Sequence, residues 1–169
     1  QISLIEKIEK AGFTYKTPDG IYFDTSKLDD YGKLAQLDLT GQKAGARVEE
    51  NVDKKSPRDF ALWKFNKELG WESPWGKGFP GWHIECSAMS RKLLGNQIDV
   101  HTGGVDHIPV HHNNEIAQTE SVTGKQFVNY WMHNEHITID GQKISKSVRK
   151  TVFIKNVIDI GFSPLSLRN

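Results

Sequence analysis

Several features that would define a class of protein are scarce or absent in this sequence. Its single cysteine, Cys86, excludes an internal disulfide and fits a reducing compartment, so we expect a cytoplasmic protein. No apolar run reaches the roughly 18 residues that a membrane-spanning helix needs, so we expect no membrane association. The net charge of +1 gives no bulk attraction to nucleic acid, and any RNA contact would need a local basic patch.

The ends of the chain also lack the usual signals. Gln1 opens directly into a helical pattern without an initiator methionine or a helix cap, and the chain stops abruptly at Asn169. We therefore expect a fragment or an excised domain. The 169 residues suffice for one substantial core, or for one core with a small appended module.

The first part of the chain contains both helix and hairpin signals. Ile2, Ile5 and Ile8 recur at spacings of three and predict a short amphipathic helix. Asp19-Gly20 lies between aromatic-rich runs and predicts a hairpin. Two further elements are expected here, a helix near residues 26–36 and a strand at residues 60–65.

The second part predicts an α/β fold. The expected elements are a helix over 81–95 with Ile84, Met89 and Leu93 toward the core, a buried strand at 98–101, a break at Gly103-Gly104, a helix after Pro109, a strand at 127–132, a hairpin over 136–147 and a helix over 152–160. This alternation is the signature of a doubly wound sheet, on which ligands bind at the carboxyl ends of strands. Gly103, Gly104 and His133 lie at such ends.

The stretch from Trp82 to Glu115 predicts a metal site. It contains the only cysteine and five of the seven histidines. His111 and Glu115 are four residues apart and share one face of a helix, while Cys86 comes from another helix. Pro109 argues against a helix through both His107 and His111. The competing interpretation is that Cys86 is simply a buried apolar residue and the histidine pair lies on the surface.

A second group of residues predicts phosphate binding. Lys143 and Lys146 lie in the segment Lys143-Ile-Ser-Lys-Ser147 at the end of the expected hairpin, where lysines and hydroxyls can hold a polyphosphate. Gly103-Gly104 would let a nucleotide approach the backbone, and Asp106 could accept hydrogen bonds from ribose hydroxyls. A charged surface loop is the alternative interpretation of the lysine segment.

Together these motifs resemble those of the class I cysteinyl-tRNA synthetases. The matching segments, which follow that family's order, are Gly81-Trp-His-Ile-Glu-Cys-Ser-Ala-Met-Ser90, His101-Thr-Gly-Gly-Val-Asp106, His111-His-Asn-Asn-Glu-Ile-Ala-Gln118, Asn129-Tyr-Trp-Met-His133 and, in the place of a KMSKS loop, Lys143-Ile-Ser-Lys-Ser147. The resemblance covers nearly the whole chain. It implies the second half of a Rossmann-like nucleotide-binding domain with a connective insertion.

The resemblance implies a role for each candidate residue. Cys86, His111 and Glu115 would bind one Zn²⁺, while Trp82 and His101 would line the pocket for cysteine. Gly103, Gly104, Asp106, His133 and Lys146 would contact ATP, which enters with Mg²⁺, and Lys143 and Lys146 would be the catalytic lysines. The intact enzyme would activate cysteine as cysteinyl-adenylate, transfer it to tRNA(Cys) and function as a monomer.

The resemblance also divides the chain and reveals departures. The implied parts are 1–12, the end of the first Rossmann half; 13–75, the insertion; 76–147, the second half; and 148–169, the start of a helical region. The family's HIGH motif and other zinc-binding cysteine have no counterpart here, so we expect the isolated chain to be inactive. Val148-Arg149-Lys150 replaces the usual continuation of the loop, and Asn113 stands where the family commonly has Glu.

Two other functions fit parts of the same pattern. The cysteine ligase of mycothiol synthesis shares zinc and adenylation but joins cysteine to an amino sugar. A non-catalytic paralogue that binds zinc or tRNA would need only some of these residues. The segment from Asn113 to Gln118 and the insertion favour the synthetase.

Overall fold

The computed structural model describes residues 1–36, 52–136, 138–139, 142–143 and 153–167. Contacts divide the chain into two compact units, Gln1–His133 and Asn134–Asn169, and each is described by itself. Lys146 and the departure at residues 148–150 lie outside the described residues. The boundaries expected at residues 12, 75 and 147 stay predictions.

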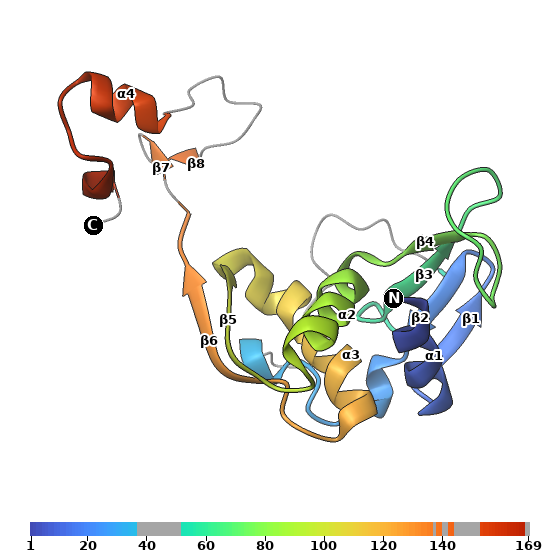
Figure 1. Ribbon diagram of the computed structural model, residues 1–169. Helices are drawn as coiled ribbons and strands as arrows, with labels where there is room; N and C mark the ends of the chain where they lie inside the picture. The colour runs from blue at the N-terminus through green and yellow to red at the C-terminus, as the bar shows by residue number, and fades with distance from the viewer. Residues whose placement is uncertain (37–51, 137, 140–141, 144–152, 168–169) are drawn as a thin grey trace. The chain divides into compact units, whose positions relative to one another are not determined.

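A four-stranded antiparallel sheet forms one side of the first unit, in the order β1-β2-β3-β4 (Figure 1). Its strands are β1 Thr14–Thr17, β2 Gly20–Phe23, β3 Phe60–Phe65 and β4 Gly78–Pro80. The predicted hairpin is confirmed, since Thr17 pairs with Gly20 across the turn. A Cβ on Gly20 would lie 2.3 Å from the carbonyl oxygen of Trp63, so the close approach of β2 to β3 requires glycine here.

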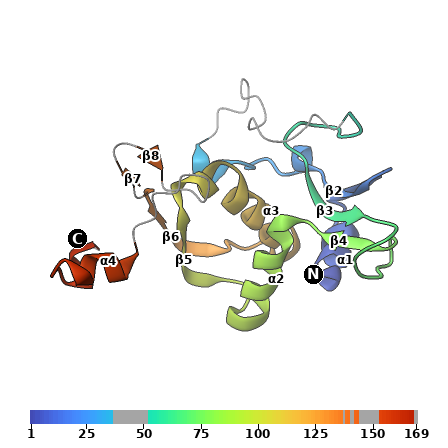
Figure 2. The same ribbon diagram turned by 90° about the horizontal axis from the view of Figure 1, so that it is seen from above.

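Three helices pack against one another, and the first two also contact this sheet (Figures 1 and 2). They are α1 Ile2–Lys10, α2 Trp82–Leu94 and α3 Asn113–Thr123. The predicted amphipathic helix α1 buries Ile5 and Ile8. The main core joins these helices to the sheet through Leu4, Ile5, Ile8, Ile21, Phe23, Tyr31, Phe60, Leu62, Trp63, Ile84 and Ala117. The core therefore fixes α2, which carries Cys86, and α3, which carries Glu115.

Two expectations about helices are wrong. Instead of a helix over 26–36 the chain forms two single 3₁₀ turns, η1 Thr25–Lys27 and η2 Lys33–Ala35, because Gly32 between them adopts a φ of 89°. Met89 and Leu93 are 52% and 77% exposed rather than directed to the core. At about 100° per residue they lie roughly 140° and 180° around α2 from the buried Ile84.

The predicted α/β class is confirmed by a second layer of strand and helix. Strands β5 Ile98–Gly104 and β6 Val128–Asn134 form a two-stranded sheet, and α3 connects them in sequence. Ile98, Phe127 and Val128 form a second buried cluster with Trp131 against it. The other residues of β5 are exposed or half-buried, and the strand continues through Gly104, so the expected buried strand at 98–101 that breaks at Gly103-Gly104 is corrected.

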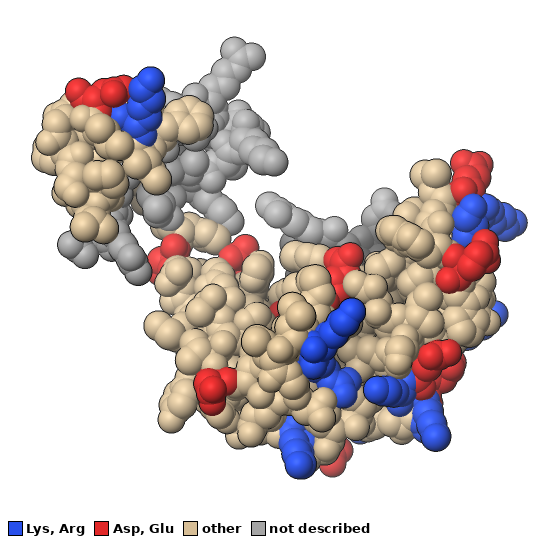
Figure 3. Space-filling model, in the orientation of Figure 1, with Lys and Arg blue, Asp and Glu red and all other residues tan. Residues whose placement is uncertain are grey.

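The second unit contains short elements. Strands β7 Thr138–Ile139 and β8 Gln142–Lys143 pair antiparallel, as the predicted hairpin requires, and the predicted last helix is α4 Ile154–Asp159, followed by the turn η5 Pro164–Leu167. Among the described residues, no helix is both long and apolar enough to cross a membrane. On the face shown in Figure 3, lysines and arginines are interspersed with acidic residues in the described part of the first unit.

Candidate metal and nucleotide site

The site begins where the chain leaves β5. Two short turns, η3 Val105–His107 and the π-helical turn η4 Ile108–His112, connect β5 to α3. Pro109 lacks an N–H and lies in the first turn of η4, and single π turns are frequent at functional sites. This path buries His111 and His112 to 5% and 1% exposure. Two consecutive histidines thereby enter the interior together.

The predicted ligands Cys86, His111 and Glu115 converge. One ligand atom from each of them lies within 4.8 Å of the other two. His111 Nε2 is 3.0 Å from Glu115 Oε1, as expected for side chains four residues apart at the start of a helix. Cys86 reaches the same point from the first turns of α2, which packs on α3. The structure thus brings together three residues that are separated by up to 29 positions.

These three side chains fit a zinc ion. Glu115 is fully buried, and among the described residues its Oε1 has no hydrogen-bond partner, although His111 Nε2 lies 3.0 Å away. Burial, followed by the nearby Glu115 and Glu85 carboxylates, raises the pKa of the Cys86 thiol. A divalent cation would supply the missing partner and stabilise the thiolate beside these acids. Thiolate, imidazole and carboxylate are all ligands that zinc accepts.

A second group of potential ligands shares Glu115. His101, His112 and Glu115 also offer atoms within 4.8 Å of one another, and His101 Nε2 lies 2.8 Å from Glu115 Oε2. Burial raises the pKa of Glu115, but the contacts with His101 and His111 outweigh it and lower this pKa to about 2. The carboxylate is therefore ionised at neutral pH and its two oxygens face different histidines.

Further histidines complete a continuous cluster around these residues. His83 Nδ1 lies 2.8 Å from His111 Nδ1, and His112 Nδ1 lies 2.8 Å from His133 Nε2. Burial, followed by the neighbouring His111, lowers the pKa of His83 to about 4, and burial likewise lowers the pKa of His112 to about 4. Both rings are neutral at pH 7 and can accept hydrogen bonds.

Sequence reasoning missed His83. The ring is buried three residues before Cys86, and it packs against Phe60 of the sheet as well as His111. Its place in the sequence, directly before the apolar Ile84 that was predicted to face the core, could have indicated that His83 is buried too. The contact with His111 depends on how α2 and α3 pack, which spacing alone does not reveal.

The predicted pocket residues lie on the rim of this cluster. Trp82 is 63% exposed, and its ring centroid is 4.7 Å from that of His111 and 6.2 Å from that of His107. His101 is half-buried, with its ring 4.8 Å from Trp131. Their roles in binding cysteine stay predictions, although both reach the candidate metal ligands.

The predicted nucleotide residues are only partly grouped. Gly103 and Gly104 end β5, Asp106 is exposed in η3, and His133 lies near the end of β6 beside His112. The structure gives Gly103 a packing reason, because a Cβ there would lie 2.5 Å from His112 Cε1. Lys143 belongs to β8 in the other unit. The ATP-binding and catalytic roles of all these residues stay predictions.

Comparison with known proteins identifies relatives along the whole chain. The family described as tRNA synthetases class I (C) catalytic domain matches residues 1–169. A cysteine–tRNA ligase of Treponema denticola is 53% identical over 172 residues and covers 99% of this chain. A second, cysteine–tRNA ligase 1 of Burkholderia lata, is 53% identical over 174 residues with the same coverage of this chain.

A third relative is similar to nearly the same extent. The cysteine–tRNA ligase of Methanococcus maripaludis strain C7 is 50% identical over 158 residues, which are 92% of this chain. The matches cover 35%, 37% and 33% of the three relatives. The chain therefore spans about a third of the length of the curated relatives that it matches.

Proposed function

Because this chain belongs to the class I (C) tRNA synthetase catalytic domain family, we propose that it is the cysteine-selecting part of a cysteine–tRNA ligase. The convergence of Cys86, His111 and Glu115 carries this proposal. The three residues would hold one Zn²⁺ beside the exposed ring of Trp82. A thiolate, an imidazole and a carboxylate would bind the metal, and a substrate thiol could reach it from solvent.

The chemistry of the substrate explains why a metal would be used. Cysteine and serine differ in one atom, and a purely apolar pocket separates such near-isosteres by only about 1–3 kcal/mol. Bound zinc would accept the cysteine thiolate as a ligand far better than a serine hydroxyl. Trp82 and His101 would bound the pocket, and the ionised Glu115 would help to retain the metal while the substrate exchanges.

For the whole enzyme, we propose the two steps of amino-acid activation and transfer. The carboxylate of cysteine attacks the α-phosphorus of ATP, the α–β phosphoanhydride bond breaks, and pyrophosphate leaves with Mg²⁺. A hydroxyl of the terminal adenosine of tRNA(Cys) then attacks the acyl carbon, and AMP leaves. Gly103, Gly104, Asp106 and His133 would orient the nucleotide, and Lys143 and Lys146 would neutralise the phosphates.

Zinc analysis of the purified chain tests the metal proposal. We expect about one zinc per chain, and the substitution Cys86→Ser should abolish most of it, because a hydroxyl replaces the softest ligand. Ser87→Ala is the matched control, since Ser87 is the next residue of α2, is buried, and hydrogen-bonds Gln118 rather than a predicted ligand. Equal zinc content in the wild type and Cys86→Ser would overturn the ligand assignment.

A further inference from the structure

We propose that Asn113 is a positioning residue for the metal ligands, and that it acts by binding the π turn η4 to residues 31–34 of the predicted insertion. This inference rests on the proposed zinc site and adds to it. Asn113 touches none of the three predicted ligands through its side-chain hydrogen bonds. Its hydrogen bond to the Ile108 carbonyl instead fixes the backbone of the π turn that carries His111.

The amide of Asn113 uses both of its ends. The residue is 1% exposed, and Nδ2 donates to the carbonyl of Ile108 at 2.7 Å, with Pro109 O at 3.5 Å. Oδ1 accepts from the backbone N–H of Leu34 at 3.2 Å. Ile108 begins the π turn, so one side chain ties the start of η4 to the first residue of α3 and to η2.

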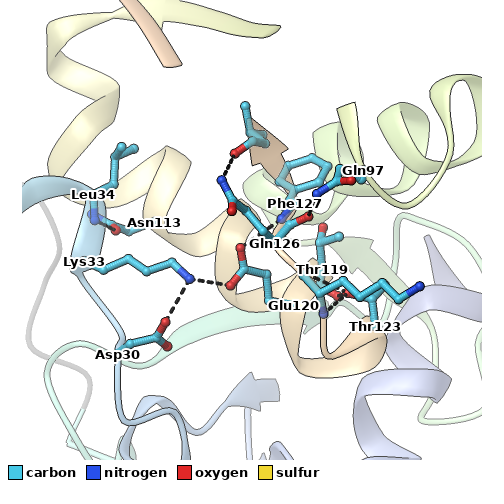
Figure 4. Close-up of polar contacts among 12 residues, drawn as sticks. Asp30, Lys33, Leu34, Gln97, Asn113, Thr119, Glu120, Thr123, Gln126 and Phe127 are labelled. Carbon is cyan, nitrogen blue, oxygen red and sulfur yellow. Dashed lines mark hydrogen bonds and ion pairs between the residues drawn. The ribbon is translucent and has the colours of Figure 1, made fainter. Parts of the chain in front are cut away.

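Two further contacts hold the same helix to the same segment. The hydroxyl of Tyr31 donates to Asn114 Oδ1 at 2.6 Å, and Lys33 forms an ion pair with Glu120. Glu120 Oε1 also accepts from the backbone N–H of Phe127, just before β6. Figure 4 shows Lys33 reaching from Asp30 to Glu120, with Leu34 beside Asn113.

The helix therefore has one side for anchoring and another for metal ligands. Asn113 and Glu120 are seven residues apart and lie on nearly the same side of α3. His111 and Glu115 lie roughly 160–200° around the axis from Asn113. Leu34 and Lys33 bind the side of Asn113 and Glu120, and Tyr31 binds the neighbouring Asn114 about 100° away. These contacts fix the rotation of the helix and hence the direction of the predicted metal ligands.

An amide suits this position because it supplies a donor and an acceptor at once. Aspartate keeps the acceptor for the Leu34 N–H but cannot donate to the Ile108 carbonyl when ionised. Leucine has similar size and loses both hydrogen bonds without adding charge. The two substitutions Asn113→Asp and Asn113→Leu therefore separate the π-turn bond from simple charge effects.

Cobalt titration of the full chain, followed by its visible spectrum, tests this role. We expect both Asn113 variants to bind Co²⁺ about tenfold more weakly than the wild type, with altered d–d bands, as for outer contacts that orient metal ligands. The added negative charge of Asn113→Asp would by itself attract the cation. Weaker Co²⁺ binding by this variant could therefore not be explained by charge and would point to the lost hydrogen bond. Unchanged affinity and bands in both variants would overturn the inference.

The controls distinguish this inference from the proposed function. Asn66→Asp and Asn66→Leu make the same changes at an asparagine whose Oδ1 caps a turn, with Glu68 N at 3.0 Å, and both should leave cobalt binding unchanged. Loss of the thiolate-to-cobalt band in Cys86→Ser supports the metal site. If Cys86→Ser keeps the band, the metal site is wrong; if only the Asn113 variants behave as wild type, this inference alone is wrong.

A substitution at the surface tests the same contact if the Asn113 variants do not fold. Lys33→Met breaks the ion pair with Glu120 at the half-exposed edge of the same contact. We expect weaker cobalt binding in the same direction, by a smaller factor, in a chain whose circular dichroism matches the wild type. Wild-type affinity in Lys33→Met would then contradict the positioning role.

Discussion

At the scale of single residues, Gly103 has a packing role that the sequence does not reveal. The sequence presents it as a place where a nucleotide could approach the backbone. The structure shows that a Cβ on Gly103 would meet two atoms of the His112 ring, Cε1 at 2.5 Å and Nε2 at 2.8 Å. His112 is buried and hydrogen-bonded to His133, so its ring cannot move aside easily. The absence of a side chain at Gly103 therefore leaves room for the His112 ring.

We predict that Gly103→Ala destabilises the metal-free chain by about 1–3 kcal/mol, the usual cost of overpacking an interior. Urea unfolding gives this free energy. The cost should shrink when the same change is made in a His112→Ala background, because the colliding ring is then gone. An equal cost in both backgrounds would show that His112 is not the source of the strain.

The three predicted metal ligands illustrate what a sequence reveals at this scale. The spacing of His111 and Glu115 predicted their approach, since residues four apart share one face of a helix. Cys86 was added to them because of its chemical type and through the family resemblance. The contribution of Asn113 was not foreseen, because its partners Ile108 and Leu34 are set by a π turn and by the folding of the insertion.

At the scale of elements, the β1–β2 hairpin depends on the side chain of Asp19. Oδ1 accepts from the Thr17 hydroxyl at 2.7 Å and Oδ2 from the Tyr22 hydroxyl at 2.9 Å, and Lys64 forms an ion pair with it. Burial raises the pKa of Asp19, but the bonds from Lys64, Thr17 and Tyr22 outweigh it and hold this pKa far below its ordinary value.

This shift predicts an acid-dependent part of the stability. A carboxyl with a depressed folded-state pKa stabilises the fold above its unfolded-state pKa, near 3.8, and this stabilisation is lost as the pH falls below that value. Unfolding free energy measured between about pH 5 and pH 2 should therefore fall less steeply in Asp19→Asn than in the wild type. Asp29→Asn, which removes an exposed carboxylate, should keep the wild-type slope; identical slopes in all three proteins would refute the role of Asp19.

Elements with a strong local signal were predicted, and those set by tertiary contacts were not. Asp19-Gly20 and the isoleucines of α1 specify their hairpin and helix locally. Residues 26–36 are polar and charged in a way that is compatible with a surface helix. Gly32 has a positive φ, however, and Tyr31 hydrogen-bonds Asn114, so the segment packs along α3 instead of forming a helix of its own. Leu93 was assigned to the core by its apolar character, although its angle on α2 leaves it 77% exposed.

At the scale of the whole molecule, the described apolar interior belongs to the first unit. Both buried clusters lie within residues 4–128, and they support the two helices and the strand that surround Glu115. In the second unit, Phe153, Ile160 and Leu165 are each more than half exposed. The candidate metal ligands therefore belong to the unit that contains both buried clusters. We expect this core to hold them in place, so that the geometry of a bound metal can be measured in this chain.

X-ray absorption at the zinc edge of the zinc-loaded chain measures directly which atoms bind the metal. We expect one sulfur at about 2.3 Å together with nitrogen and oxygen ligands at about 2.0–2.2 Å, from Cys86, His111 and Glu115. Added cysteine should contribute a second sulfur at a similar distance, and added serine should not. A zinc shell without any sulfur would contradict the proposed Cys86 ligand, and a shell that added cysteine leaves unchanged would contradict the proposed selection of cysteine by zinc.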